Sequence, residues 1–316
     1  MKTLRSYEDV PGDLRGGVIA IGNFDGVHRG HQAVIAKTLG LAQQNHAGAP
    51  VGVMCFSPHP RRFFAPDAPL FQLTTEAQKV DLFAAQDLDF TAIIPFDAAL
   101  AGLDAEAFVA DVLVAGLGVA HVVIGYDFHF GKKRGGSPQT MQALGETHGF
   151  GVTIVAPESD GGEIYSSSRV RAHLRAGDVA EAARLLGRPW SVRGEVAHGD
   201  GRGTGLGFPT ANIAMPDGAD LLPGIYAVRV KRRDALVDGA AYLGTRPTFD
   251  GIDVRLETFL FDFDGSLYGD EIEVMFVAFV RGDEAFADGE ALARQMDIDV
   301  ANARDALAAD ASRDAA

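Results

Sequence analysis

Short apolar runs alternate with amphipathic stretches along the first half of the chain. The runs are rich in β-branched residues and lie at Val18–Ile21, Val51–Phe56, Thr91–Phe96, His121–Tyr126 and Val152–Val155. Such continuous runs are typical of parallel strands buried on both faces. Capping residues precede the stretches between them, at Thr75, Asp104 and Asp178. The alternation predicts a doubly wound, Rossmann-like α/β domain, whose ligands bind beyond the carboxyl ends of the strands.

The pattern changes after Gly187, where Arg188-Pro189-Trp190 interrupts the helical periodicity. The strand candidates that follow have no helix between them. They are Ser191–Ala197, Ile225–Arg232, Val237–Leu243, Val254–Phe263 and Glu271–Val280. Turn signals such as Asp-Gly separate them, which predicts an antiparallel β-barrel.

One helix is expected to close the chain. Leu292, Met296 and Val300 recur every four residues, and the acidic end of the sequence resembles a frayed tail. We therefore predict an α/β domain, a barrel domain with a C-terminal helix, and a flexible tail, with the bounds 1–187, 188–310 and 311–316.

Composition and charge narrow the functional classes. The 316 residues are 47% apolar and 22% charged, as in an ordinary globular protein. The net charge of −15 argues against a nucleic-acid partner, which needs a basic face. No membrane-spanning stretch or secretion signal is evident, so we expect a cytoplasmic protein. Cys55 is the sole cysteine, which excludes an intrachain disulfide and a cysteine-based zinc site. The oligomeric state stays open.

A glycine-rich turn, GNFDGVHRGH, joins the first predicted strand to the first predicted helix. His28 and His31 are three residues apart, so they lie on one face of the helix start, beside N–H groups without intrahelical partners. Gly22, Gly26 and Gly30 allow tight turns and the close approach of a ligand. The turn therefore suits an anion, and two imidazoles can donate to phosphate oxygens as charge develops. The ordinary alternative is a glycine-rich loop with two solvated histidines.

Four segments together resemble one known family. GNFDGVHRGH resembles the phosphate-binding motif of the nucleotidyltransferase superfamily, in the form found in prokaryotic bifunctional riboflavin kinase/FAD synthetases. FSPHP at 56–60 resembles the family's "FxPHP", and GYDFHFG at 125–131 resembles its "G-x-[DN]-F-x-FG". SSSRVR at 166–171 resembles "SSTRIR", with Ser168 where threonine is usual. Each segment is weak alone, and their order is specific.

The resemblance implies roles for residues of these segments. It makes His28 and His31 catalytic and predicts flavin contacts at His59, Asp127 and Phe128. The phosphates of ATP are expected at Gly22, Asn23, Phe24, Asp25, Gly26, Gly30, Lys132, Ser167, Ser168 and Arg171. Lys132 begins a basic loop flanked by glycines that can close over a triphosphate, and the serines and Arg171 open a helix, where a leaving pyrophosphate is favoured. As ordinary alternatives, Asp127 caps a turn and Lys132 lies in a solvated loop.

The predicted barrel carries a second motif, GEVAHGDGRGTGLGFPTANI. Gly203, Gly205 and Gly207 provide a backbone that can wrap phosphates, although glycine repeats are more often simply mobile loops. Thr210 and Asn212 point to the same side of a strand, where their neutral oxygens can hold Mg²⁺ together with ATP phosphates. An ordinary polar strand face is the alternative.

This stretch resembles the "GFPTAN" signature of riboflavin kinases, and YLGTRPTF after it resembles the family's "xxGxxPTF". By alternation Arg255, Glu257 and Phe259 share one strand face, which can hold an apolar ring beside one carboxylate. In the family the matching glutamate is the general base, which makes Glu257 the catalytic candidate. A solvated barrel glutamate is the alternative. Phe259 stands where many relatives have histidine, and Phe208 and Phe259 are expected to contact the flavin.

The expected function is two transferase reactions on one chain. The barrel domain transfers the γ-phosphoryl group of ATP to riboflavin, and the α/β domain transfers the adenylyl group of a second ATP to FMN, which gives FAD and pyrophosphate. The expected partners are small molecules: riboflavin, FMN and ATP, with Mg²⁺ as cofactor and FMN and FAD as products. Two alternatives stay open, namely a nucleotidyltransferase for another phosphate ester and a flavin sensor that has lost its chemistry.

Overall fold

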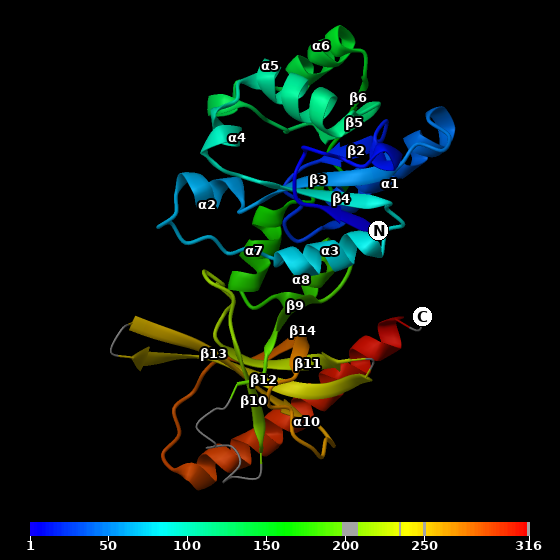
Figure 1. Cartoon of the computed structure of the whole chain (residues 1–316). Helices are drawn as coiled ribbons and strands as arrows, with labels where there is room; N and C mark the ends of the chain where they lie inside the picture. The colour runs from blue at the N-terminus through cyan, green and yellow to red at the C-terminus, as the bar shows by residue number, and fades with distance from the viewer. Residues whose placement is uncertain (198–207, 234, 249–250, 315–316) are drawn as a thin grey trace. The chain divides into compact units, whose positions relative to one another are not determined.

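A computed structural model describes residues 1–197, 208–233, 235–248 and 251–314 (Figure 1). The chain forms two compact units, residues 1–167 and residues 168–316. Each unit is described by itself below.

The first unit is built on a six-stranded parallel sheet in the order β1-β4-β3-β2-β5-β6. Its strands are β1 Lys2–Leu4, β2 Val18–Ile21, β3 Val51–Ser57, β4 Phe90–Pro95, β5 His121–Gly125 and β6 Gly151–Val155. Strands β3 and β4 are added in chain order on one side of β2, and β5 then pairs on the other side of β2. The strand order therefore reverses between β2 and β5, where open α/β sheets form their binding crevice. The predicted doubly wound fold is confirmed.

Two apolar layers pack against the two faces of this sheet. On one face, Ile35 of α1 and Phe83 of α3 pack with Val18 and Val53. On the other face, a second layer surrounds Met141. The helical elements of this unit are η1 Gly12–Leu14, α1 Arg29–Asn45, α2 Pro60–Phe64, α3 Glu76–Ala84, α4 Ala98–Gly102, α5 Ala105–Ala107, the π-helix η2 Phe108–Leu117, η3 Lys132–Arg134 and α6 Pro138–His148. A short hairpin, β7 Ser159–Asp160 and β8 Glu163–Ile164, follows β6.

The predicted helix caps are present. The Thr75 side chain accepts a hydrogen bond from Gln78 N at 3.2 Å, and the Gln78 side chain accepts one from Thr75 N, which completes a capping box. The Asp104 side chain caps α5 by accepting a hydrogen bond from Ala107 N at 2.9 Å. The Asp178 side chain caps α8, Val179–Leu186, by accepting one from Glu181 N at 3.2 Å. Local signals for helix starts were thus sufficient here, because a cap depends on residues only three apart.

The second unit is an antiparallel sheet in the order β10-β13-β12-β11-β14-β9, with a long C-terminal helix. Its elements are α7 Ser167–Arg175, which begins at the last residue of the first unit, α8 Val179–Leu186, β9 Trp190–Glu195, β10 Thr210–Ala214, β11 Gly224–Arg232, β12 Ala235–Thr248, β13 Gly251–Leu260, β14 Glu271–Arg281 and α10 Gly289–Asp314. Ala197 N donates to Asn212 O at 2.9 Å, so the two ends of the strand order meet and the sheet curls toward a barrel. The predicted antiparallel architecture with its C-terminal helix is confirmed.

Two boundaries differ from the expectation. Helix α10 runs to Asp314, past residue 310, because the alanine-rich end of the sequence favours helix. The compact units divide at residue 167, ahead of Gly187, because α8 packs on β9 and β14 and Leu222 N donates to Leu174 O at 3.1 Å. A sequence pattern shows where a helix ends but not which core it packs on. The functional boundary at 187/188 stays a prediction.

Candidate functional site

The loop between β2 and α1 lies at the switch point of the first sheet. Gly22 N donates to Met54 O at 3.1 Å, which continues the pairing of β2 with β3 past Ile21. Phe24 and Val27 have positive φ angles of 49° and 44°, which are rare for residues with a side chain. Both side chains are buried, so packing of the loop into the core compensates for this backbone conformation.

The two predicted catalytic histidines form one stacked pair. Their ring centroids are 3.6 Å apart, and His28 Nδ1 caps α1 by accepting a hydrogen bond from His31 N at 3.4 Å. A side chain at Gly30 would approach both the His28 ring and Tyr165 Cβ to 3.2 Å, so only glycine fits without displacing the pair. The sequence therefore placed these residues on one side of the helix start correctly.

Burial sets the charge state of His31. His28 is 5% exposed, and among the described residues no hydrogen-bond partner reaches His31 Nδ1. Burial lowers the pKa of His31 well below its usual value, and the nearby His28 and Lys79 lower it further. His31 is therefore a neutral imidazole near pH 7, with a buried nitrogen that a ligand can satisfy.

Asp25 ties the loop to the chain before α3. Its Oδ1 accepts hydrogen bonds from Leu73 N at 2.9 Å, Thr74 N at 3.3 Å and Thr74 Oγ1 at 3.4 Å. Ser167 Oγ donates to Asp25 O at 2.8 Å, which brings the start of the serine segment to the loop. Ser168 is exposed and Arg171 half-buried, both farther along α7. Asp25 thus has a structural task in addition to its predicted contact with phosphate, which stays a prediction.

The second predicted segment leads into an aromatic cluster. His59 caps α2, with Nδ1 accepting from Arg61 N at 3.1 Å. The cluster consists of rings in edge contact at centroid distances of 5.2–5.7 Å, namely Phe56, Phe63, Phe64 and Phe96. Phe64 is 67% exposed, an unusual position for a large apolar ring. Sequence analysis missed this cluster, although Phe56 opens the FSPHP segment and Phe63 and Phe64 follow that segment after two arginines.

The third predicted segment follows β5, on the other side of the switch point. Asp127 is exposed, and its carbonyl lies 2.8 Å from His129 Nδ1. Phe128 stacks on Phe130 with a centroid distance of 5.7 Å. The Lys132 side chain is exposed, and its backbone N–H donates to Leu103 O at 2.7 Å, which fixes the start of the basic turn. The candidate flavin and phosphate residues after β5 are therefore accessible to a ligand.

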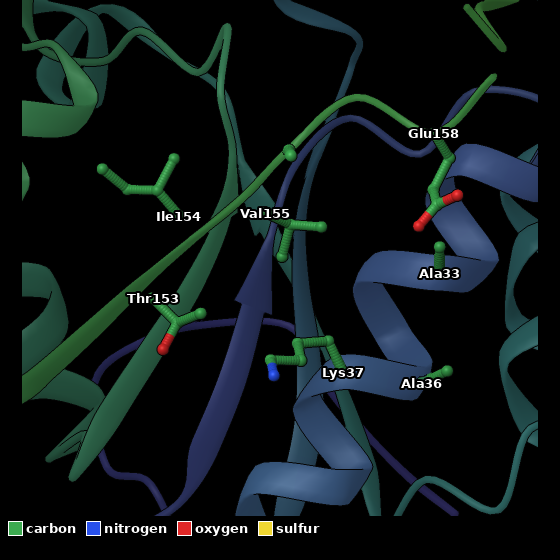
Figure 2. Close-up of a pocket in the computed structure, with 8 residues that line it drawn as sticks. Ala33, Ala36, Lys37, Thr153, Ile154, Val155 and Glu158 are labelled. Atoms are coloured by element: carbon green, nitrogen blue, oxygen red, sulfur yellow. The ribbon is translucent and has the colours of Figure 1, made fainter.

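A hollow of about 430 Å³ lies between α1 and the edge strand β6. Figure 2 shows Lys37 reaching from α1 toward Thr153 and Val155 of β6, with Ala33 on the same helix and Glu158 beyond the strand. Ala33 follows His31 by two residues, and two residues turn a helix by about 200°. The hollow therefore opens on another side of α1 than the side that carries His31.

In the second unit the predicted kinase residues share one face of the sheet. Thr210 of β10 lies directly opposite Phe259 of β13, and Asn212 lies opposite Glu257. All four side chains are half-buried, whereas the alternate positions, such as Thr258, face the core. Directly opposed residues have Cβ atoms about 4.5–5.5 Å apart. The strand register thus places two neutral oxygens and one carboxylate within reach of a common ligand.

Tyr242 of β12 lies opposite Glu257 on its other side, and sequence analysis missed it. Its hydroxyl donates to Asp283 Oδ2 at 3.2 Å, and burial raises the pKa of Tyr242, with further contributions from Asp283 and Glu257. A side chain at Gly244 would collide with the Tyr242 ring, so the ring lies along the strand over this glycine. Nothing in a single strand's alternation shows that this tyrosine stands beside the glutamate.

Aromatic rings border this face. Phe208 packs edge-on against Phe259 with a centroid distance of 5.2 Å, and Phe259 meets Phe261 at 5.9 Å. The predicted phosphate residues Gly203, Gly205 and Gly207 lie outside the described residues.

Comparisons with known proteins identify a family for each part of the chain. A family model described as FAD synthetase matches residues 10–169, and one described as riboflavin kinase matches residues 186–307. A bifunctional riboflavin kinase/FMN adenylyltransferase of Pseudomonas fluorescens is 39% identical over 98% of both chains. One from Escherichia coli K12 is 37% identical over 96% of this chain and 97% of the relative.

A solved structure has the same fold along nearly the whole chain. It is a crystal structure described as a macrolide-efflux protein from Streptococcus pneumoniae, with a TM-score of 0.84 and 28% identity over 94% of this chain and 96% of that chain. Across the part of the chain that the structure describes, no helix is long and apolar enough to cross a membrane.

Proposed function

The chain belongs to the family of bifunctional riboflavin kinase/FMN adenylyltransferases, and from this premise we propose how each of its sites works. The second unit phosphorylates riboflavin to FMN with ATP, and the first unit adenylylates FMN to FAD. The observation that carries the assignment of residues is the strand register that sets Asn212 opposite Glu257, together with the stacked His28 and His31 at the switch point.

In the kinase site, Glu257 accepts the proton of the ribityl hydroxyl as that oxygen attacks the γ-phosphorus of ATP. The phosphorus–oxygen bond to ADP breaks, and ADP leaves. Phe208 and Phe259 offer an apolar edge for the flavin ring, and Tyr242 holds the other side of Glu257.

The residues at this face fit a magnesium ion. Mg²⁺ prefers oxygen ligands and is usually held by few protein groups together with substrate phosphates. Thr210 and Asn212 supply neutral oxygens beside Glu257, and the described residues contain no cluster of three His, Cys, Asp or Glu side chains that could form a cage. When bound, Mg²⁺ would neutralise part of the charge on the ATP phosphates.

In the adenylylation site, the FMN phosphate is already anionic and attacks the α-phosphorus of ATP without a protein nucleophile. His28 and His31 donate to the transferring group, and the exposed basic turn that begins at Lys132 offers positive charge to the leaving pyrophosphate. The predicted contacts with the flavin, His59, Asp127 and Phe128, gain an apolar surface from the aromatic cluster that contains Phe64. Positioning and charge stabilisation supply the catalysis.

The test is a product analysis of the full chain. Incubation with riboflavin, ATP and Mg²⁺, followed by chromatographic separation of the flavins, should give FMN first and FAD later. Chelation of divalent cations should stop FMN formation, and added Mg²⁺ should restore it. If the chain binds flavins but converts none, the flavin-sensor alternative replaces this proposal. If FMN accumulates and is never adenylylated, the first unit has another acceptor.

A further inference from the structure

Lys79 is a buried cation on α3 whose role in the two reactions is not yet explained. Lys79 is 4% exposed, although lysine is rarely buried without a partner. Its hydrogen bond among the described residues is a long one, from Nζ to Asn23 O at 3.4 Å. The carboxylate of Glu76 acts on Lys79 from a greater distance, and Arg5 already pairs with that carboxylate.

The ammonium group lies under the loop that follows β2. Asn23, whose carbonyl it contacts, is the second residue of GNFDG, and the same charge also acts on the buried ring of His31. His31 Nδ1 itself has no hydrogen-bond partner in the described part of the chain. Two buried polar groups, one of them charged, therefore meet the same short loop without a full set of partners.

Burying an ammonium beside a neutral carbonyl has an energetic cost. Removing an ammonium from water costs several kcal/mol, and a paired carboxylate is what usually offsets it. The neutral carbonyl of Asn23 is a weaker partner than a carboxylate, and the long distance weakens it further. The chain as a whole is acidic, with a net charge of −15, so an anionic ligand needs local positive charge.

We propose that Lys79 is a positioning residue of the adenylylation site, whose ammonium supplies fixed positive charge beneath the GNFDG loop for the phosphates of ATP. It acts through the loop, since Asn23 lies between it and the ligand. Anionic oxygens of a ligand above the loop would pair electrostatically with the ammonium, and the contact of Lys79 with the Asn23 carbonyl holds the loop beneath them. The proposal rests on adenylyl transfer taking place at His28 and His31.

A purely structural role for Lys79 makes a different prediction about stability. If the ammonium only holds the loop, Lys79→Met lowers the unfolding temperature. If it serves the ligand, Lys79→Met removes a buried charge and fills the same space with an apolar chain, a change that is often neutral or stabilising. The variant then loses activity without a lower unfolding temperature, a combination that a purely structural role does not produce.

The experiment compares Lys79→Met, Lys79→Gln and Lys79→Arg in the full chain, with Lys37→Met as the control because Lys37 is an exposed lysine of the same unit. We expect the Met and Gln variants to lose about tenfold to a hundredfold in kcat/KM for ATP in FAD formation from FMN. The loss is smaller than the ~10²–10³-fold effect of removing a donor that contacts the reacting group. Binding of inorganic tripolyphosphate, measured by calorimetry, should weaken by about tenfold. FMN formation from riboflavin and the unfolding temperature should stay at the parental values.

The outcomes separate the proposal from the activity on which it rests. If the parental chain makes no FAD from supplied FMN, the adenylylation assignment fails. If the parental chain makes FAD and the Gln variant matches it in kcat/KM and tripolyphosphate binding, the role of Lys79 is refuted. Should the Met variant fail to fold, the Gln variant answers the same question, since it also lacks the charge. Lys79→Arg should retain most of the activity, and equal loss in Arg and Gln would overturn the electrostatic argument.

Discussion

Replacing Asp25 by alanine tests how the loop between β2 and α1 is held. The Asp25 carboxylate accepts hydrogen bonds from Leu73 N at 2.9 Å and from both Thr74 N and Thr74 Oγ1 at 3.3 and 3.4 Å. Hydrogen bonds to a charged group contribute about 1.5–3 kcal/mol, and buried donors left without an acceptor add a desolvation cost. Counting the short bond fully and the two longer ones in part, we expect Asp25→Ala to destabilise the first unit by about 3 kcal/mol.

This loss should be visible in calorimetric unfolding of the full chain. For a unit of this size, 1 kcal/mol corresponds to about 2–4 °C, so the transition of the first unit should move down by about 6–12 °C. Asp25→Asn keeps one neutral acceptor and should cost only about 1 kcal/mol. The matched control is Asp67→Ala, an exposed aspartate of the same unit, which should stay within about 0.5 kcal/mol of the parental chain.

FAD formation gives the second readout for Asp25. If the loop is merely less stable, the Asp25→Ala variant should regain activity at low temperature, where its first unit is folded. If Asp25→Ala instead unfolds like Asp67→Ala and still forms no FAD, the carboxylate acts on the ligand and the anchoring argument is wrong.

Further expectations concern charge state and domain limits. Burial, His28 and Lys79 lower the pKa of His31, so the unfolded chain binds a proton at this ring more readily than the folded chain does. The folded state is therefore destabilised by this ring only when the pH falls below about 6.5, the pKa of a free histidine. Above that pH the effect is absent. In an NMR titration the His31 ring should still be neutral at pH 6, and a ring that titrates like free histidine would contradict this. A fragment covering 168–316 should fold and phosphorylate riboflavin. A fragment covering 186–316 should be less stable because it lacks α7 and α8, which belong to the same compact unit. Equal unfolding temperatures of the two fragments would argue against that packing.

Local patterns were sufficient for most of the fold. The apolar runs of the first half became strands of a parallel sheet, because burial on both faces leaves a continuous signal. Caps such as Thr75 are decided within one turn of helix. The sequence could not show that α7 and α8 belong to the second unit. Leu174 and Leu185 are apolar, and they would be buried equally well in either core.

The candidate sites divide in the same way. The proximity of His28 and His31 could be predicted because they lie within one turn, and the shared face of Glu257 and Phe259 because side chains alternate along a strand. Their roles came from the family resemblance and stay predictions. Tyr242 was missed because its position beside Glu257 depends on the register between β12 and β13, which no single strand reveals. Lys79 was missed because a lysine in an amphipathic helix looks like a solvated residue until its burial is seen.

The central claim is that two independent sites act in sequence on the flavin. Glu257→Gln removes the base, so FMN formation should fall by about 10²–10⁴-fold while adenylylation of supplied FMN persists. The double variant His28→Ala, His31→Ala should still make FMN and lose FAD formation, since each lost donor costs about 10²–10³-fold.

The most direct measurement is chromatographic product analysis of both variants, started once from riboflavin and once from FMN. We predict a double dissociation: the Glu257 variant converts only FMN, and the histidine variant stops at FMN. Parental FMN formation by the Glu257 variant, or parental FAD formation by the histidine variant, would contradict the account.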